Sequence, residues 1–170
     1  MAPDPSTPRR AGVLRTAAAA VRRWLAPRSA APPPASPTGY PGDFTGRLVP
    51  GYSPKPDGRP DPGEIVWTWV PFEEDHRRGK DRPVLLVGRD GPWLLALQLT
   101  SKDHDGFPAR AGTPRWVDIG SGAWDRQGRP SEVRVDRVVR IDPRAVRREG
   151  AVLSRQRFEA VARAVADLHR

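Results

Sequence analysis

Short apolar segments separated by polar loops dominate the second half of the chain. Residues 64–70 (EIVWTWV) are rich in β-branched and aromatic side chains and alternate between two faces, which predicts a first strand. Two continuous apolar runs follow, at residues 83–87 and 93–99, and the turn dipeptide Asp90-Gly91 between them predicts a β-hairpin. Because neither run alternates, we expect both faces of the hairpin to be covered, as in a small barrel or a sheet packed under other elements.

The pattern weakens after the hairpin and then ends in a helix. Residues 115–119 are compatible with a short strand, and residues 131–141 with one strand or a bent pair of strands. Ser154 is a natural N-cap, and the apolar residues after it recur at three- and four-residue spacing, which predicts an amphipathic helix. These residues are Phe158, Val161, Ala162, Val165 and Leu168. Strands followed by one closing helix favour a mainly β fold, either a small antiparallel barrel with a packed helix or an α+β domain.

The first 61 residues have a different composition. Most of the prolines fall here, with Ala, Ser and Gly between them, and such a segment buries too little apolar area to offset its ordering entropy. We therefore expect a basic, disordered N-terminal extension over residues 1–61, with disorder from about residue 26 to residue 61, and an ordered domain over residues 62–170. Residues 13–25 are compatible with a short basic helix that contacts RNA or a membrane surface, although a helix this short is barely stable alone.

Composition narrows the partners and the compartment. Lys and Arg outnumber Asp and Glu by 29 to 20, which gives a formal net charge of +9 and favours an anionic partner. The chain has no cysteine, which excludes disulfides and thiolate metal sites and fits a reducing compartment. It also has no run of about 18 apolar residues, the length that predicts a membrane-spanning helix. We expect a cytoplasmic protein that does not associate with a membrane.

The two ends of the hairpin carry the strongest candidate for chemistry. Arg82 opens the first run, and Thr100 and Ser101 close the second. In an antiparallel pair joined by a short turn, the start of one strand lies beside the end of the next, so Arg82 and Thr100 should be neighbours. A guanidinium fixed beside a hydroxyl is suited to binding a phosphate.

An ordered set of short motifs resembles the PemK/MazF family of toxin endoribonucleases. The set consists of GEIVW at residues 63–67, Arg82-Pro83 before an apolar strand, LTS at residues 99–101, and RVVRIDPRAV at residues 137–146 followed by a Leu-Ser-capped helix. The resemblance covers about residues 62–170. It implies a compact, SH3-like barrel, usually dimeric, and a toxin of a type II toxin–antitoxin system. It also implies cleavage of single-stranded RNA (mRNA) without a metal or other cofactor, and inhibition by an antitoxin whose acidic, disordered segment fills the RNA groove.

The resemblance also implies roles for Arg82 and Thr100 that agree with their chemistry. RNA can be cut when its 2′-hydroxyl attacks the adjacent phosphorus, and this needs a proton acceptor, a proton donor and groups that stabilise charge on the phosphoryl oxygens. Arg82 would act as a charge clamp because a guanidinium keeps its proton at neutral pH. Thr100 would donate to a phosphoryl oxygen or hold the 2′-hydroxyl in line. The expected products carry a 2′,3′-cyclic phosphate and a 5′-hydroxyl, and DNA should not be cut.

Further residues complete the predicted site. Ser101 and His76 are candidate catalytic residues, and His104 is a weaker candidate proton carrier because a histidine in a polar loop is more often only solvated. Trp116 and Trp124 are the candidates for stacking on unpaired bases. The residues predicted to bind RNA are Arg78, Lys80, Lys102, Trp116 and Arg134. Lys102 directly follows the LTS motif, where many members of the family carry an uncharged polar residue, so the phosphate environment or the preferred sequence is expected to differ.

Two other functions stay open on the sequence. One is a barrel that binds RNA or inhibits a protein without cutting, since one fold supports unrelated activities. The other is a metal-dependent nuclease that uses Asp103, His104 and Asp105, although neighbouring residues on an extended loop rarely point at one ion. Loss of cleavage in a chelator would favour the second.

Overall fold

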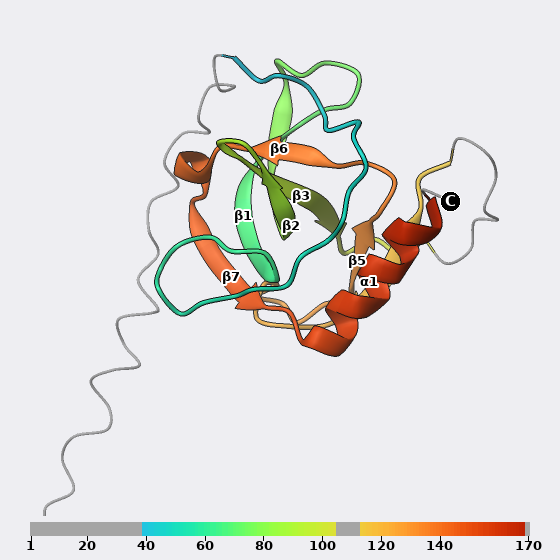
Figure 1. Cartoon of the computed structure of the whole chain (residues 1–170). Coiled ribbons are helices and arrows are strands. Elements are labelled where there is room, and N and C mark those ends of the chain that lie inside the picture. Colours follow the sequence, from blue (N-terminus) through green and yellow to red (C-terminus); the bar gives the residue numbers. More distant parts are fainter. Residues whose placement is uncertain (1–38, 105–112, 169–170) are drawn as a thin grey trace, which may run out of the picture. The chain divides into compact units, whose positions relative to one another are not determined.

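The computed structural model describes residues 39–104 and 113–168, all within a compact unit spanning Pro32–Arg170. Seven antiparallel strands are followed by one helix, which confirms the predicted mainly β fold with a C-terminal helix (Figure 1). The elements are β1 (Glu64–Pro71), β2 (Gly79–Asp90), β3 (Trp93–Thr100), β4 (Trp116–Gly120), β5 (Ser131–Arg134), β6 (Val139–Ile141), a 3-10 turn (Pro143–Ala145), β7 (Arg148–Val152) and α1 (Arg155–Leu168).

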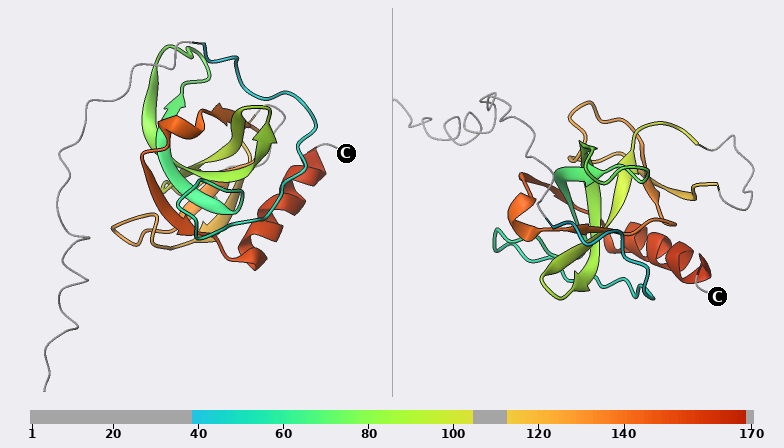
Figure 2. Two further views of the ribbon diagram at one scale, coloured as in Figure 1. Left: turned by 60° about the vertical axis from the view of Figure 1, so that its left-hand side comes forward. Right: turned by 90° about the horizontal axis from the view of Figure 1, so that it is seen from above.

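The strands form one strongly bent sheet in the order β4-β5-β3-β2-β1-β7. Strand β6 lies off this path and pairs with the first half of β3, whereas β5 pairs with the last two residues of β3. Because β3 changes partner along its length, the sheet bends at this strand into a half-barrel, and Figure 2 shows the strands curving around an interior. The predicted hairpin is β2 and β3, joined at Gly91 and Pro92.

Both faces of the hairpin are buried, as its continuous apolar runs predict. Leu85 and Leu97 belong to the larger core, which also contains Phe158 of α1. Val84 and Leu86 lie on the opposite face in a smaller core with side chains of β1, β3 and β6. Alternate residues of β2 thus serve two separate cores, which explains why its apolar run does not alternate with polar residues.

Helix α1 packs on the larger core through the predicted stripe. Phe158, Val161 and Val165 are buried. At the helix start the Ser154 hydroxyl accepts a hydrogen bond from the Arg157 main-chain nitrogen at 3.5 Å. The helix therefore begins and faces inward as its sequence predicts. No helix among the described residues is long and apolar enough to cross a membrane.

Residues 39–61 pack along the barrel, which corrects the expectation of disorder up to residue 61. Leu48 is 5% exposed and belongs to the larger core. The Tyr52 hydroxyl donates to the Leu153 carbonyl at 2.9 Å, and the Gly51 main-chain nitrogen donates to the Val87 carbonyl at 2.8 Å. This proline-rich segment has no core of its own, but single apolar side chains anchor it to a barrel formed by the rest of the chain. The predicted helix at residues 13–25 lies outside the described residues.

Candidate functional site

Arg82 and Thr100 lie just beyond the last pair of the β2–β3 ladder. That pair is Val84 with Gln98, so each of the two residues follows it by two positions on its own strand. Alternate residues of a strand point to the same face, so each shares the face of its member of the pair. Both side chains are half-buried, so each is held by the sheet and remains in contact with solvent.

Arg82 and Thr100 each have a cross-strand partner on a neighbouring strand. On one side Arg82 is paired with Thr68 of β1, whose buried hydroxyl donates to the Ala145 carbonyl at 3.2 Å. On the other side Thr100 is paired with Glu132 of β5. We call Arg82 and Thr100, with these two cross-strand partners, the row; it lies at the point where the β2–β3 ladder ends.

Arg82 is a cation without a protein counter-ion in the described part of the chain. Within residues 39–104 and 113–168 its guanidinium makes no hydrogen bond or ion pair. Pairing with Thr68 of β1 fixes its main chain. A half-buried guanidinium with its donors unused is suited to receiving an anion from solution.

The main chain just after β3 holds the Thr100 hydroxyl. The Lys102 main-chain nitrogen donates to Thr100 Oγ1 at 3.2 Å. Because a hydroxyl can accept and donate at once, Thr100 keeps its own proton for a ligand. Ser101 and the Lys102 side chain are exposed at the end of the strand.

A second polar cluster lies beside Thr100. The Glu132 carboxylate accepts from the His104 main-chain nitrogen at 3.1 Å and contacts His104 Nδ1 at 2.7 Å. The imidazole is stacked on Trp116, with 4.4 Å between ring centroids and 8° between ring planes. This cluster joins β5, β4 and the segment after β3, and it fixes the imidazole in orientation.

The loop between β1 and β2 lies before Arg82 and is internally hydrogen-bonded. The Phe72 main-chain nitrogen donates to the Arg78 carbonyl at 2.8 Å, and the Arg78 guanidinium lies 5.7 Å from the Phe72 ring centroid. His76 contacts Tyr40 edge-to-face at 5.1 Å. Arg78 and Lys80 are exposed. The predicted cations of this loop therefore face solvent, whereas His76 is partly covered by the N-terminal segment.

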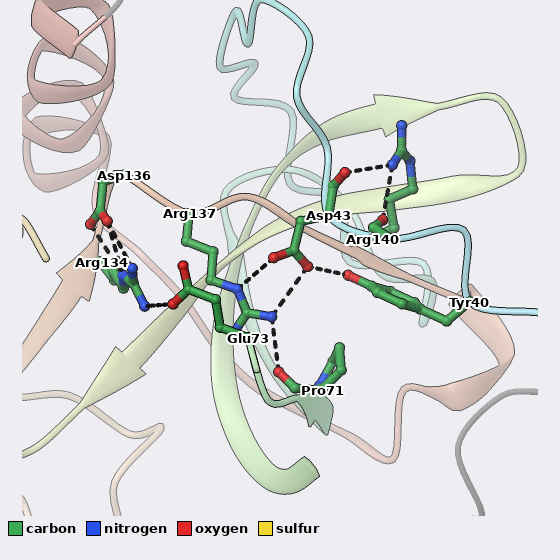
Figure 3. Close-up of polar contacts among 9 residues, drawn as sticks. Tyr40, Asp43, Pro71, Glu73, Arg134, Asp136, Arg137 and Arg140 are labelled. Atoms are coloured by element: carbon green, nitrogen blue, oxygen red, sulfur yellow. Dashed lines mark hydrogen bonds and ion pairs between the residues drawn. The ribbon is translucent and has the colours of Figure 1, made fainter. Parts of the chain in front are cut away.

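Three arginines of the β5–β6 region are already paired (Figure 3). Arg134 contacts Asp136 at 2.8 Å and Glu73 of the β1–β2 loop at 2.9 Å, and its side chain is only 12% exposed. Two carboxylates thus match the charge of Arg134. RNA binding by Arg134 stays a prediction, made for a guanidinium that is already paired. Its observed contacts tie the β1–β2 loop to β5.

Arg137 and Arg140 bind the N-terminal segment to the barrel. Arg137 contacts Asp43 at 2.7 Å and donates to the Pro71 carbonyl at 3.0 Å. Arg140 contacts Asp90 at 2.8 Å and donates to the carbonyls of Gly42 and Asp43, each at 2.9 Å (Figure 3). These two arginines therefore stabilise the fold and are not available to line a groove.

The Asp43 carboxylate is the centre of this cluster. Burial raises the pKa of Asp43, but hydrogen bonds from Arg137 and from Tyr40, the latter at 2.5 Å, outweigh it and hold the pKa below the ordinary value. Burial and the neighbouring carboxylate raise the pKa of the Tyr40 hydroxyl. Asp43 is thus ionised at neutral pH, and Tyr40 keeps its proton as a donor.

The tryptophans separate into buried and accessible ones. Trp124, predicted to stack on a base, is 4% exposed and donates through Nε1 to Ser131 Oγ at 3.0 Å, so it is a core residue. Trp116 is half-buried at the edge strand β4. Only Trp116 of these two retains an accessible ring, and it already carries the His104 imidazole on one face.

Sequence reasoning missed Glu132 as part of this region. Its signal is a single carboxylate in the short strand SEVR, at the position paired with Thr100. No group of three or more His, Asp or Glu side chains in residues 39–104 and 113–168 is arranged to hold a metal ion. Of the residues considered for a metal site, Asp105 lies outside the described residues.

The fold and the site define a small antiparallel half-barrel with a closing helix and an open arginine at the end of its hairpin. The family model of the PemK-like, MazF-like toxins of type II toxin–antitoxin systems matches residues 61–169. This protein therefore belongs to that toxin family. No curated protein sequence matches it.

Two solved structures are similar to this chain, and both are crystal forms of MazE-MazF from Deinococcus radiodurans. Form III is 21% identical, covers 65% of this chain and 95% of its own, and has a TM-score of 0.46. Form II is 21% identical, covers 66% of this chain and 97% of its own, and has a TM-score of 0.44.

Proposed function

We propose that this protein is the toxin of a type II toxin–antitoxin system and acts as a metal-independent endoribonuclease on single-stranded RNA. The observation that carries the proposal is the row formed by Arg82 and Thr100. Both residues lie two positions beyond the last pair of the β2–β3 ladder and are half-buried, and Arg82 has no side-chain partner among the described residues, which supports a shared phosphate site. Membership of the toxin family supports the same activity.

In the proposed reaction the scissile phosphate lies over this row. Arg82 donates to the non-bridging oxygens and compensates the charge that develops on them in the transition state. Thr100 donates to the phosphoryl group or holds the 2′-hydroxyl in line with the leaving 5′-oxygen. Attack by the 2′-oxygen forms a 2′,3′-cyclic phosphate and releases a 5′-hydroxyl. Ser101 and His76 are proposed to act at the edge of the same site.

Exposed cations around the row are proposed to bind the RNA backbone. Lys80 and Arg78 precede the row on the chain, and Lys102 follows it, so together they frame the phosphate position. Trp116 provides an aromatic surface for an unpaired base. Arg134 is proposed to act only through the loop that it holds, because its charge is already matched.

An acidic antitoxin segment is the proposed protein partner. The similar solved structures are MazE-MazF complexes, and the net charge of +9 of this chain favours an acidic partner. Such a segment would cover the cations that bind RNA and thereby inhibit cleavage. We propose that the toxin is a cytoplasmic homodimer.

The proposal is tested by incubating the purified protein with a long single-stranded RNA in EDTA and mapping the ends. Wild type is expected to cut at defined positions and to leave 2′,3′-cyclic phosphates. Arg82→Ala and Thr100→Ala are expected to lose this activity, whereas Arg163→Ala, an exposed arginine of α1, serves as the matched control. A single 2′-deoxy nucleotide at a mapped cut should prevent cleavage there.

Three results would contradict the proposed site, the metal independence or the cleavage activity itself. Equal cutting by the Arg82 and Thr100 variants would place the chemistry elsewhere. Cutting that EDTA removes would favour a metal-dependent nuclease. RNA binding without any cutting would favour a non-catalytic binding module on the same barrel.

A further inference from the structure

The clamp of Glu132 on His104 is more than a surface ion pair. One carboxylate oxygen accepts from the His104 main-chain nitrogen and the other contacts the ring at Nδ1, so main chain and side chain are held together. Glu132 is 8% exposed, which shields the contact from water. The imidazole is 26% exposed, so one part of the ring remains open to solvent.

The contact with Glu132 determines which ring nitrogen is available. An ionised carboxylate only accepts hydrogen bonds, so the Nδ1 atom at 2.7 Å must carry a proton. In the neutral ring Nε2 is then an acceptor. Stacking on Trp116 fixes the ring plane. His104 therefore offers an oriented proton-accepting nitrogen, which is the arrangement of a general base held by a third group.

The cluster is also in the right place relative to the proposed phosphate. Glu132 is paired with Thr100, and Thr100 and Arg82 each lie two residues beyond the last pair of the β2–β3 ladder. A phosphate gripped by these two residues would lie one strand away from the carboxylate that holds the imidazole. The neighbouring nucleotide then meets His104 at the β5 side of the row.

We propose that His104 is the general base of the cleavage reaction and that Glu132 is its positioning residue. This inference rests on the proposed ribonuclease activity. The proton of the attacking 2′-hydroxyl moves to His104 Nε2 while the 2′-oxygen forms a bond to phosphorus. The bond from phosphorus to the 5′-oxygen breaks, its electron pair leaves on that oxygen, and the oxygen takes a proton from water. His104 then returns its proton to solvent, and Glu132 compensates the charge of the imidazolium in between.

Two variants of His104 separate this role from a structural one. His104→Asn retains an amide donor close to the position of Nδ1 and can keep the bond to Glu132, but it has no group at the position of Nε2. His104→Ala removes both. Loss of a general base reduces kcat by about 10²–10⁴-fold. We expect both variants to show a loss of this size, with unchanged affinity for an RNA blocked by 2′-O-methylation and an unchanged melting temperature for His104→Asn.

Glu132→Gln tests the positioning role. The amide has one acceptor oxygen for the two donors that Glu132 serves, the His104 main-chain nitrogen and Nδ1, so one contact is lost and the ring is expected to turn or to change tautomer. We expect a lower kcat with an unchanged KM, and unchanged activity for Glu159→Gln, an exposed glutamate of α1. An unchanged kcat, or a loss that appears only in KM, would show that Glu132 does not act through His104.

A modified substrate distinguishes a general base from a general acid. An RNA with sulfur in place of the bridging 5′-oxygen has a leaving group that needs no proton, but its 2′-hydroxyl must still be deprotonated. We expect His104→Asn to remain impaired on this substrate. Restored cleavage would mean that His104 serves the leaving group, and full activity of His104→Asn on ordinary RNA would overturn the inference.

The proposed function is tested separately in the same experiment. If wild type cuts the RNA, Arg82→Ala does not, and His104→Asn cuts normally, only the role of His104 is rejected. If wild type does not cut, the ribonuclease assignment itself is rejected.

Discussion

Two groups of arginines on this barrel differ in what surrounds their charge. Arg137 is 6% exposed, contacts a carboxylate and a carbonyl, and joins the N-terminal segment to the end of β1. Arg82 is half-buried on β2 and has no side-chain partner among the described residues. A charge removed from water is costly unless it is paired. The first arginine therefore stabilises the fold, whereas the second keeps its donors for a ligand.

A basic composition alone does not identify the residues that bind an anionic partner. The net charge of +9 favours an anionic partner, but Arg134, Arg137 and Arg140 are each matched by carboxylates. Only cations without such partners can contribute fully to an RNA interface. The structure thus removes Arg134, Arg137 and Arg140 from the cations that are free to bind RNA.

The largest effect on stability is expected from Asp43→Ala. This change leaves Arg137 buried without its carboxylate and removes the acceptor of Tyr40. Breaking a buried pair on one side costs about 3–5 kcal/mol, and we expect about 3 kcal/mol because Asp43 is partly exposed. Denaturant unfolding measures the loss. Arg82→Ala should not change the free energy of unfolding by more than about 0.5 kcal/mol.

A smaller effect is expected from Trp116→Leu, which tests an accessible residue of the proposed RNA interface. Removing a base-stacking ring costs about 1–3 kcal/mol per base. We expect RNA with blocked 2′-hydroxyls to bind about tenfold more weakly, measured by fluorescence anisotropy. Trp124→Phe, a change in the core, should lower the melting temperature without a specific loss of RNA affinity. Equal RNA affinity of the Trp116 variant and wild type would remove Trp116 from the interface.

The ion pair of Asp43 and Arg137 should make the protein less stable in acid. The pKa of Asp43 is held below its ordinary value, so its stabilising effect is complete above the unfolded pKa and is lost as the pH falls through the folded pKa. The free energy of unfolding should therefore decrease as the pH falls below about 4. In Asp43→Asn this decrease should be shallower. An identical pH dependence in wild type and variant would show that the pair does not contribute.

The smallest effect concerns the salt dependence of RNA binding. Lys102 is exposed, and one lost phosphate contact lowers the slope of log affinity against log salt by about 0.7 for a single strand. We expect Lys102→Gln to show this decrease. Arg134→Gln should leave the slope unchanged, because two carboxylates already match the guanidinium. Equal slopes for the two variants would contradict the division into open and paired cations.

The fold was predictable where local pattern decides it. The hairpin, the alternating first strand and the helix after Ser154 all carry their own periodicity. Strand β7 does not, because it is short and rich in charge and depends on main-chain pairing with β1. The packing of residues 39–61 could not be predicted from the sequence either, because it depends on single side chains, such as Leu48, that contact a surface formed by distant strands.

The site was predictable only in part for the same reason. The hairpin and its antiparallel pairing follow from the short turn, but the register shift between Leu86 and Gly88 has no signal in the sequence. The proximity of Arg82 and Thr100, at the ends far from the turn, stays a prediction. The position of Glu132 beside Thr100 and its clamp on His104 depend on pairing between β3 and β5, which are separated along the chain by β4 and the segments on either side of it. Sequence also cannot tell a paired arginine from an open one, because the partners Asp43 and Glu73 lie far away along the chain.

The central claim is that Arg82 and Thr100 grip one phosphodiester, and a double-mutant cycle of cleavage tests it most directly. Rates of single-turnover RNA cleavage would be measured for wild type, Arg82→Ala, Thr100→Ala and the double variant. If both residues act on one phosphate, their effects are coupled, and the double variant should differ from the sum of the single losses by at least about 0.5 kcal/mol. Losses that add to within about 0.3 kcal/mol, or full activity of either single variant, would contradict the account.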